Sequence, residues 1–286
     1  MNKFKEKLFE IFFMLVACVS ILCVLIICVF LFANGMPAMT EIGIFDFLFG
    51  TTWQPTATNP SFGIFPMILG SIYITVGAVL VGVPIGILTA VFLTKYCSKK
   101  VVACLKPMVN LMAGIPSILY GFFGMVVLVP MVRNIFGINL TSGSSIFTAS
   151  LLLGFMILPT IIGLSQSAIE AVPSYYYEGA RALGATHENS IFKVVLPAGK
   201  SGILASVVLG IGRAVGETMA VIMVAGNQPR VTTDVLDGIR TLTANVVMEM
   251  KYATDLHEEA LIATGVVLFV FILVINLSFS ILKRKV

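Results

Sequence analysis

Two residues of opposite charge, Arg213 and Glu217, lie four positions apart inside a long apolar segment, residues 202–226. Residues at this spacing share one face of an α-helix. Arg213 lies about 16 Å from the N-terminal end of that segment at 1.5 Å per residue. A charge near the middle of a membrane costs about 2.5–3.5 kcal/mol even on the mildest scale. This cost predicts that Arg213 and Glu217 have a specific structural or functional role near the middle of the membrane.

Two interpretations of this pair remain open. It is either a structural ion pair between helices or a site on the route of an anion, because a guanidinium can hold two anion oxygens at once. In the second interpretation Glu217 keeps Arg213 oriented and limits how tightly the anion is held. Thr218 follows directly, and an earlier apolar segment contributes Ser117 and Tyr120 beside Gly114-Ile115-Pro116. These three side chains either line the same path or belong to ordinary helix packing.

A second constellation, in residues 166–197, is an amphipathic, charged insert between two apolar runs. Ser174 can cap a first helix, and Gly184 can end it in the left-handed conformation. Thr186 can cap a second helix, which Pro197 closes. The pattern predicts two short helices that meet at a sharp turn and dock something on the membrane surface.

Signatures of nucleotide and metal chemistry are incomplete. Gly199-Lys200-Ser201 resembles the end of a phosphate-binding loop, but Val194 stands where that loop needs glycine. His187 and His257 have no ligand partners at metal-site spacing. We therefore expect no ATP hydrolysis by this chain, no enzyme activity, no cofactor and no metal.

The composition indicates an integral membrane protein. Of the 286 residues, 58% are hydrophobic and 11% are charged, whereas soluble domains carry roughly 25% charged residues. Six runs approach or exceed the roughly 20 residues that a membrane-spanning helix needs. They cover residues 9–33, 65–94, 108–132, 145–168, 202–226 and 260–282. The fold class is therefore all-α, because strand-like alternation is absent.

The basic residues orient these spans. Thirteen of the 18 lie on one side: Lys3, Lys5, Lys7, Lys95, Lys99, Lys100, Lys106, Arg181, Lys193, Lys200, Lys283, Arg284 and Lys285. Since basic residues favour the cytoplasmic side, both termini are predicted to be cytoplasmic. Residues 34–64, 133–144 and 228–259 then face outward. No nucleic-acid partner is expected, because the basic residues form no patch of their own.

The outward segments carry their own predicted elements. Phe45–Phe49 indicates a short piece at the membrane interface, and Trp53 fits either the aromatic belt or a docking surface. Apolar residues between Val235 and Val247 recur near helical spacing, which predicts a surface helix. We divide the chain into residues 1–64, an N-terminal span with its outer segment, and a core of five spans at 65–286.

The insert resembles a known loop. Glu178, Ala180, Gly184, Leu196 and Pro197, with Val194 between them, match the spacing of the "EAA" coupling loop of ABC importer permeases, and Gly179 stands where alanine is usual. The resemblance implies the type I importer fold. It also implies that these residues, Gly179 included, couple the chain to a dimer of ATP-binding subunits.

Three further segments, residues 49–55, 114–124 and 209–221, resemble the phosphate-specific branch of that family, of the PstC type. This resemblance implies a bacterial or archaeal inner-membrane importer with a second similar permease and an outer phosphate-binding protein. Two alternatives remain: a permease for another oxyanion such as sulfate or molybdate, and an ion-coupled secondary transporter.

Overall fold

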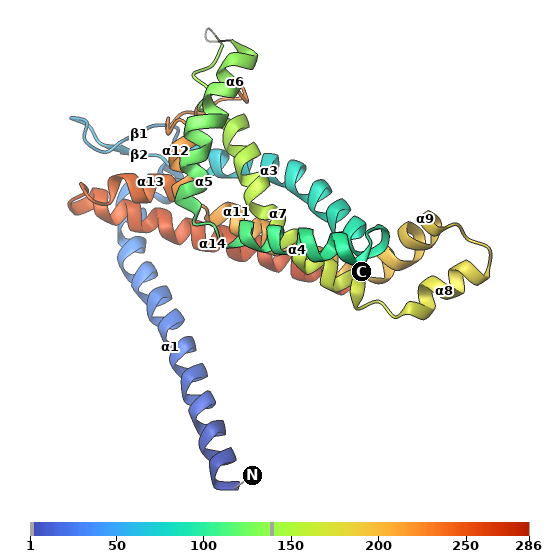
Figure 1. Ribbon diagram of the computed structural model, residues 1–286. Helices are drawn as coiled ribbons and strands as arrows, with labels where there is room; N and C mark the ends of the chain where they lie inside the picture. Colours follow the sequence, from blue (N-terminus) through green and yellow to red (C-terminus); the bar gives the residue numbers. More distant parts are fainter. Residues whose placement is uncertain (1–2, 138–139, 286) are drawn as a thin grey trace.

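The computed structural model describes residues 3–137 and 140–285 and is mostly helical (Figure 1). In this part of the chain, five helices are long and apolar enough to cross a membrane. A bent pair, His187–Ala198 with Lys200–Gly216, brings the number up to six. Parts of two predictions, the termini at residues 1, 2 and 286 and positions 138 and 139 of the outer segment, lie outside the described residues.

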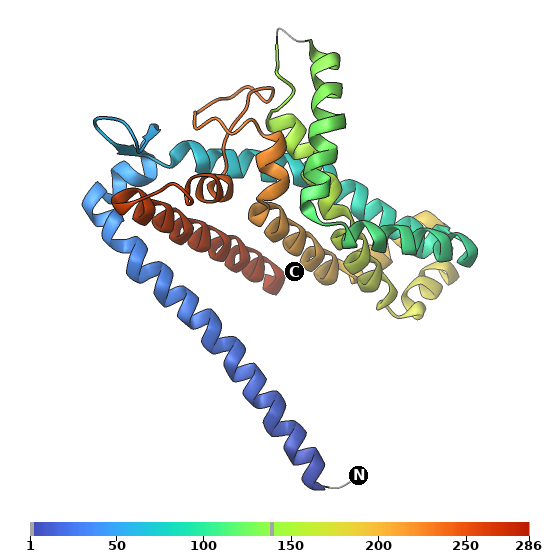
Figure 2. The same cartoon turned by 60° about the vertical axis from the view of Figure 1, so that its left-hand side comes forward.

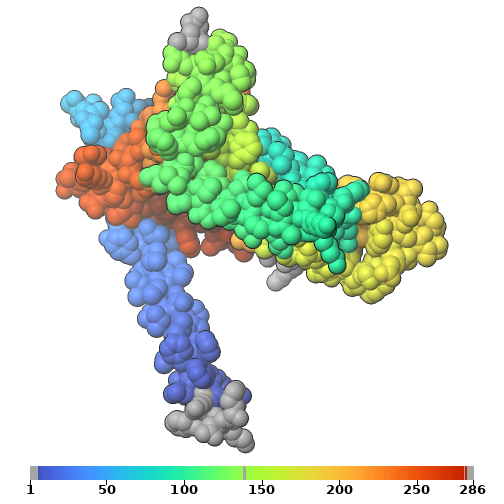
Figure 3. All heavy atoms as spheres, viewed as in Figure 1, coloured from blue at the N-terminus to red at the C-terminus, as the bar shows by residue number. Residues whose placement is uncertain are grey.

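The first helix stands apart from the rest. Helix α1 (Lys3–Ile42) has 40 residues, about 60 Å at 1.5 Å per residue, and extends well beyond the predicted span 9–33. It packs against α14 (Asp255–Lys285). Its remaining length projects away from the body of the molecule, as the space-filling view also shows (Figure 3). The predicted span 260–282 lies inside α14.

Two long helices form the centre of the core. Helix α3 (Phe65–Val91) continues through a π-helical turn to Tyr96 and packs along α7 (Ile146–Glu170). Small residues allow the close approach: a methyl group at Gly82 or Gly86 would lie 2.7 Å from side-chain atoms of Ile157 or Ile161. The predicted spans 65–94 and 145–168 are confirmed as helices.

The predicted span 108–132 is wrong at its beginning. The structure has a separate helix α4 (Lys99–Gly114), then α5 (Ser117–Phe123), a π-helical turn at Gly124–Leu128 and α6 (Val129–Phe136). Pro116 explains the break, because the residue before a proline is pushed out of the helical conformation. The apolar run that spans the membrane is residues 117–136.

The predicted span 202–226 is also interrupted. Helix α11 (Lys200–Gly216) ends at Gly216, Glu217 is extended, and α12 (Met219–Val224) begins two residues after Glu217. The apolar pattern continues across the interruption, so hydropathy alone does not reveal it. The candidate site residues lie at these two helix breaks.

The segments predicted to face outward pack into a folded layer. Helix α2 (Ile44–Phe49) confirms the predicted short piece, and strands β1 (Trp53–Gln54) and β2 (Ser61–Phe62) pair antiparallel, Trp53 opposite Phe62. Trp53 is 4% exposed, so its predicted place in the aromatic belt is wrong. Of the helix predicted between Val235 and Val247, the structure has α13 (Leu242–Glu249), and its first four residues are buried.

Candidate functional site

Two helix breaks share one backbone geometry. Ile115 follows α4 with φ −70° and ψ 125°, and Glu217 follows α11 with φ −71° and ψ 131°. In each case the helix ends on a glycine. The N–H of the extended residue still donates to the carbonyl three positions earlier, of Met112 and Ala214 respectively. Each break turns the chain into a new helix, α5 or α12.

The two new helices lie side by side and run in the same direction. A methyl group at Gly121 of α5 would lie 2.9 Å from the Ala220 Cα, and one at Gly124 would lie 2.7 Å from the Val224 Cγ1. Contacts that advance together along both helices indicate parallel packing. Figure 2 shows α5 and α12 rising together from the ends of α4 and α11. Ser117 and Thr218, at the beginnings of these helices, therefore lie at the same end of the pair.

Arg213 is held by a neighbouring helix. Its Nη1 donates to the Thr160 Oγ1 of α7 at 3.2 Å, and the residue is half-buried. A guanidinium has five N–H donors, so this bond leaves donors for another acceptor. Thr160 was absent from the sequence prediction. The available signal was a hydroxyl directly after Pro159 in an apolar span.

Glu217 does not have the role predicted from its spacing. It lies beyond the end of α11, so it does not continue the helix face of Arg213. Its Oε1 accepts a hydrogen bond from the Ala220 N–H at 3.2 Å and thereby caps the beginning of α12. Within the described residues the two side chains form no ion pair. The prediction that Glu217 orients Arg213 is therefore wrong.

Of the three other residues predicted to line the path, Tyr120 and Thr218 make hydrogen bonds at the helix breaks. The Tyr120 hydroxyl donates to the Met112 carbonyl at 2.9 Å, which fastens α5 to α4 across the first break. The Thr218 hydroxyl donates to the Gly216 carbonyl at 3.3 Å, beside the second break. Ser117 is half-buried as the first residue of α5. The structure thus brings all three side chains to the two breaks, and Arg213 lies one turn before the second.

The insert at residues 166–197 contains the predicted turn. Helix α8 (Ser174–Ala182) ends two residues before Gly184, whose φ of +86° is left-handed and favours glycine. The Gly184 N–H donates to the Arg181 carbonyl, and the Ala185 N–H donates to the Ala180 carbonyl. The prediction of a helix cap at Ser174 is wrong, because Ser174 is already the first helical residue and Pro173 precedes it.

The second helix of the insert begins as predicted and ends slightly later. Helix α9 (His187–Ser190) is capped by Thr186, whose hydroxyl accepts from the Asn189 N–H at 3.3 Å. Hydrogen bonds from its own backbone N–H and from Thr186 hold the pKa of Glu188 below its usual value. The helix continues through a π-helical turn, Ile191–Val195, into α10 (Leu196–Ala198). Pro197 thus lies inside the last turn, and a 71° bend leads into α11.

An aromatic contact that the sequence analysis missed anchors the insert. The Tyr177 hydroxyl and the His187 Nδ1 are 2.7 Å apart, which joins α8 to α9. The Tyr96 ring, at the end of the π-helical turn after α3, lies 5.0 Å from the His187 ring, centroid to centroid. The tip of the insert stays free, and Leu183 is 91% exposed. Among the predicted coupling residues, Glu178, Gly179, Gly184 and Pro197 are exposed, and Ala180 and Leu196 are half-buried.

Comparisons with known proteins agree with these features. Residues 82–286 match the family described as "Binding-protein-dependent transport system inner membrane component". The chain is 36% identical over 265 residues to the "Probable ABC transporter permease protein YqgH" of Bacillus subtilis, covering 90% of this chain and 84% of that protein. It is 35% identical over 258 residues to the "Phosphate transport system permease protein PstC" of Mesorhizobium japonicum, covering 84% and 78%.

A solved structure supports the fold. A chain of the bacterial alginate ABC transporter, solved in complex with an alginate pentasaccharide-bound periplasmic protein, matches with a TM-score of 0.68 at 17% identity. The match covers 100% of this chain and 98% of that chain. At this identity the likeness concerns the fold alone.

Proposed function

Because this chain belongs to the family of binding-protein-dependent transport system inner membrane components, and has the type I permease fold of ABC importers, we propose that it carries phosphate across the inner membrane as one permease subunit. The observation that supports phosphate as the substrate is the 35% identity to a phosphate permease over 84% of the chain. An archaeal relative, the "Probable phosphate transport system permease protein PstC" of Methanocaldococcus jannaschii, is 32% identical over 87% of the chain.

The anion path runs past the two helix breaks. Arg213 supplies a permanent positive charge with free donors, and a guanidinium matches the oxygens of phosphate. Ser117 and Thr218 add hydroxyl groups where α5 and α12 begin, and Tyr120 lines the same region. Glu217 brings a negative charge close by, which keeps a bound anion from being held too tightly.

A second, similar permease completes the path. Large apolar side chains of α4 and α5 are exposed in the single chain; Leu111 is 71% exposed and Leu119 is 55% exposed. The two helices flank the first break, α4 before it and α5 after it. A partner permease covering these faces encloses the anion path between the two subunits.

The insert receives the energy of ATP hydrolysis from separate subunits. Glu178, Gly179, Ala180 and Gly184 surround the exposed turn, and Leu196 and Pro197 lie where the insert joins α11. A dimer of ATP-binding subunits docks on this turn. The Tyr177–His187 contact holds α8 and α9 as one unit, so a push on the turn is passed to α11, which carries Arg213.

The orientation follows the basic residues. Both termini and the insert face the cytoplasm, while β1, β2 and α13 face outward. An external phosphate-binding protein delivers the anion to the outer side. The chain itself is a transport subunit in a multi-pass arrangement within the inner membrane.

The test is uptake by the complete transporter. Cells lacking their own phosphate importers receive this chain with its neighbouring permease, ATP-binding and binding-protein genes, and uptake of radioactive phosphate is measured against excess sulfate or molybdate. We expect uptake that requires the ATP-binding subunit and that neither competitor reduces. Uptake by the chain alone, or displacement by sulfate or molybdate, contradicts the proposal.

A further inference from the structure

Helix α13 connects the outer layer of the protein to the break between α11 and α12. It has 8 residues, about 12 Å at 1.5 Å per residue. Leu242, Ala244 and Asn245 in its first half are at most 1% exposed. The buried end of this helix reaches Glu217, and its other, partly exposed end reaches a pocket in the outer layer.

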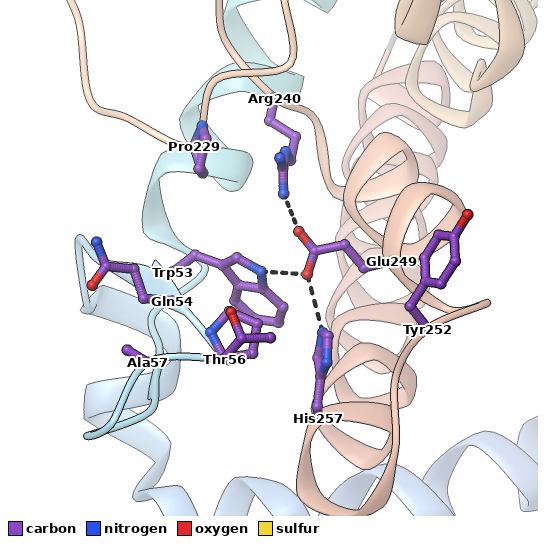
Figure 4. Close-up of a pocket in the computed structure, with 10 residues that line it drawn as sticks. Trp53, Gln54, Thr56, Ala57, Pro229, Arg240, Glu249, Tyr252 and His257 are labelled. Carbon is purple, nitrogen blue, oxygen red and sulfur yellow. Dashed lines mark hydrogen bonds and ion pairs between the residues drawn. The ribbon is translucent and has the colours of Figure 1, made fainter.

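The outer end of α13 is fastened through Glu249. Its carboxylate accepts a hydrogen bond from the Trp53 Nε1 at 2.8 Å, lies 3.0 Å from the His257 Nε2 and pairs with Arg240 (Figure 4). These three partners come from β1, from the beginning of α14 and from the loop before α13. They line a cavity of about 440 Å³ that also includes Tyr252. A molecule that enters this cavity therefore meets the side chains that hold α13.

Arg240 also connects α13 to the loop that follows α12, through Asn245 and Asn227. Its Nη1 donates to the Asn245 Oδ1 at 3.0 Å, and its Nε donates to the Asn227 carbonyl at 3.1 Å. Within the described residues, the Asn245 Nδ2 and the Asn227 Oδ1 are buried without a hydrogen-bond partner. Buried polar groups are normally paired. The cluster thus contains one buried donor and one buried acceptor that its present contacts leave unpaired.

The inner end of α13 holds the helix break. The Thr243 hydroxyl donates to the Glu217 carbonyl at 3.0 Å. Glu217 is the extended residue of the break, and its side chain caps α12. The neighbouring Leu242 N–H donates to the Ser71 hydroxyl of α3 at 3.0 Å. A displacement of α13 therefore acts on the backbone of Glu217 and on the beginning of α12.

We propose that α13 is a rigid link through which the outer pocket positions Glu217, with Glu249 and Thr243 as positioning residues at its two ends. The inference rests on the proposed transport function. It adds the route by which contact on the outer face alters the anion path. A change in the contacts of Glu249 or Arg240 at the pocket displaces α13, and α13 passes the displacement to the break.

A double-mutant cycle tests the link. Maximal phosphate uptake is measured in proteoliposomes containing the complete transporter, with Thr243→Val, Glu249→Gln and their combination. Each single change removes an interaction at one end of the same helix, and we expect each to lower uptake about tenfold. Uptake by the double variant should be no slower than uptake by the slower single variant, because both substitutions interrupt the same coupling between the pocket and Glu217. Thr243→Ser keeps the hydroxyl and should restore uptake.

Three outcomes overturn the proposal: uptake by Thr243→Val within twofold of the unmodified protein, failure of Thr243→Ser to restore uptake, or single effects that multiply in the combination. A second measurement needs neither phosphate nor the Thr243 variants. In a cysteine-free chain, a Thr218→Cys probe is labelled with a negatively charged thiol reagent, with and without Trp53→Phe. That change keeps an aromatic ring but removes the N–H that Glu249 accepts.

We expect Trp53→Phe to change the labelling rate at least threefold. An unchanged rate also overturns the link. These results differ from a failure of the proposed function, in which the unmodified transporter itself takes up no phosphate while the labelling rate still responds.

Discussion

At the residue scale, the two membrane charges are held in different ways. Arg213 is held through its side chain by Thr160, whereas Glu217 is held through its backbone by Thr243 and uses its side chain to cap α12. The two residues are four positions apart in the sequence, and they form no ion pair within the described part of the chain. Substitutions at these positions should therefore have separate effects.

Replacing Arg213 should stop transport without unfolding the protein. Arg213→Gln removes the charge but keeps a donor for Thr160, so we expect normal amounts of assembled protein and at least a hundredfold loss of phosphate uptake. Arg213→Lys keeps the charge without the planar fork of donors and should recover uptake in part. Because the structure shows no Arg213–Glu217 pair, combining Arg213→Gln with Glu217→Gln should not restore uptake. Near-normal uptake in that combination would contradict the anion site.

Two variants of Glu217 separate its charge from its cap. Glu217→Gln keeps an oxygen that can accept from the Ala220 N–H, so folding should be unaffected while phosphate is released more slowly and maximal uptake falls. Glu217→Ala also loses the cap and should cost about 1 kcal/mol of stability. Thermal unfolding in detergent and uptake kinetics test the two effects. Equal stability of both variants would argue against the cap.

At the scale of elements, the parallel pair α5–α12 depends on a glycine contact. Gly121→Val places a branched side chain where even a methyl group would lie 2.9 Å from the Ala220 backbone. Overpacking of this kind costs typically 1–3 kcal/mol, so we expect less folded protein and little uptake. Gly163→Ala in α7 is the matched control, because a methyl group there meets no described atom within 4 Å. The yield of folded protein is measured by size-exclusion chromatography. Equal losses of yield in both variants would show that the α5–α12 contact is unimportant.

The turn of the insert at Gly184 allows two substitutions to be compared at a single position. Gly184→Val forces a β-branched residue into a left-handed conformation, whereas asparagine tolerates that conformation. We expect the valine variant to reach the membrane but to lose uptake and co-purification of the ATP-binding subunits. Gly184→Asn should retain most of both. Wild-type behaviour of the valine variant would remove the turn from the coupling mechanism.

At the scale of the whole molecule, orientation can be tested by labelling from outside. In a chain with its five free cysteines replaced, a membrane-impermeant reagent should label Thr56→Cys and spare Leu183→Cys in intact cells. Both positions are exposed, Thr56 in the outer layer and Leu183 at the tip of the insert. Labelling of Leu183→Cys only after lysis completes the control, and the reverse pattern would invert the topology.

The sequence by itself determined the membrane class, the family and most helices. Long apolar runs can be satisfied in a bilayer only as helices or closed barrels, so hydropathy and the absence of strand alternation were enough. The turn of the insert was equally readable, because Gly184 acts through its left-handed backbone and Thr186 through a cap hydrogen bond three residues away. These features depend on residues close together in the chain.

Only the tertiary structure decided the site. Spacing suggested an Arg213–Glu217 pair, but the break at Glu217 redirects that side chain to Ala220, and Thr160 and Thr243 arrive from 53 and 26 positions away. Trp53 is buried in a hydrophobic cluster with Phe62, and its N–H donates to Glu249, 196 residues later. These contacts form because distant segments pack together. The residue pattern of one segment does not indicate which other segment will pack against it.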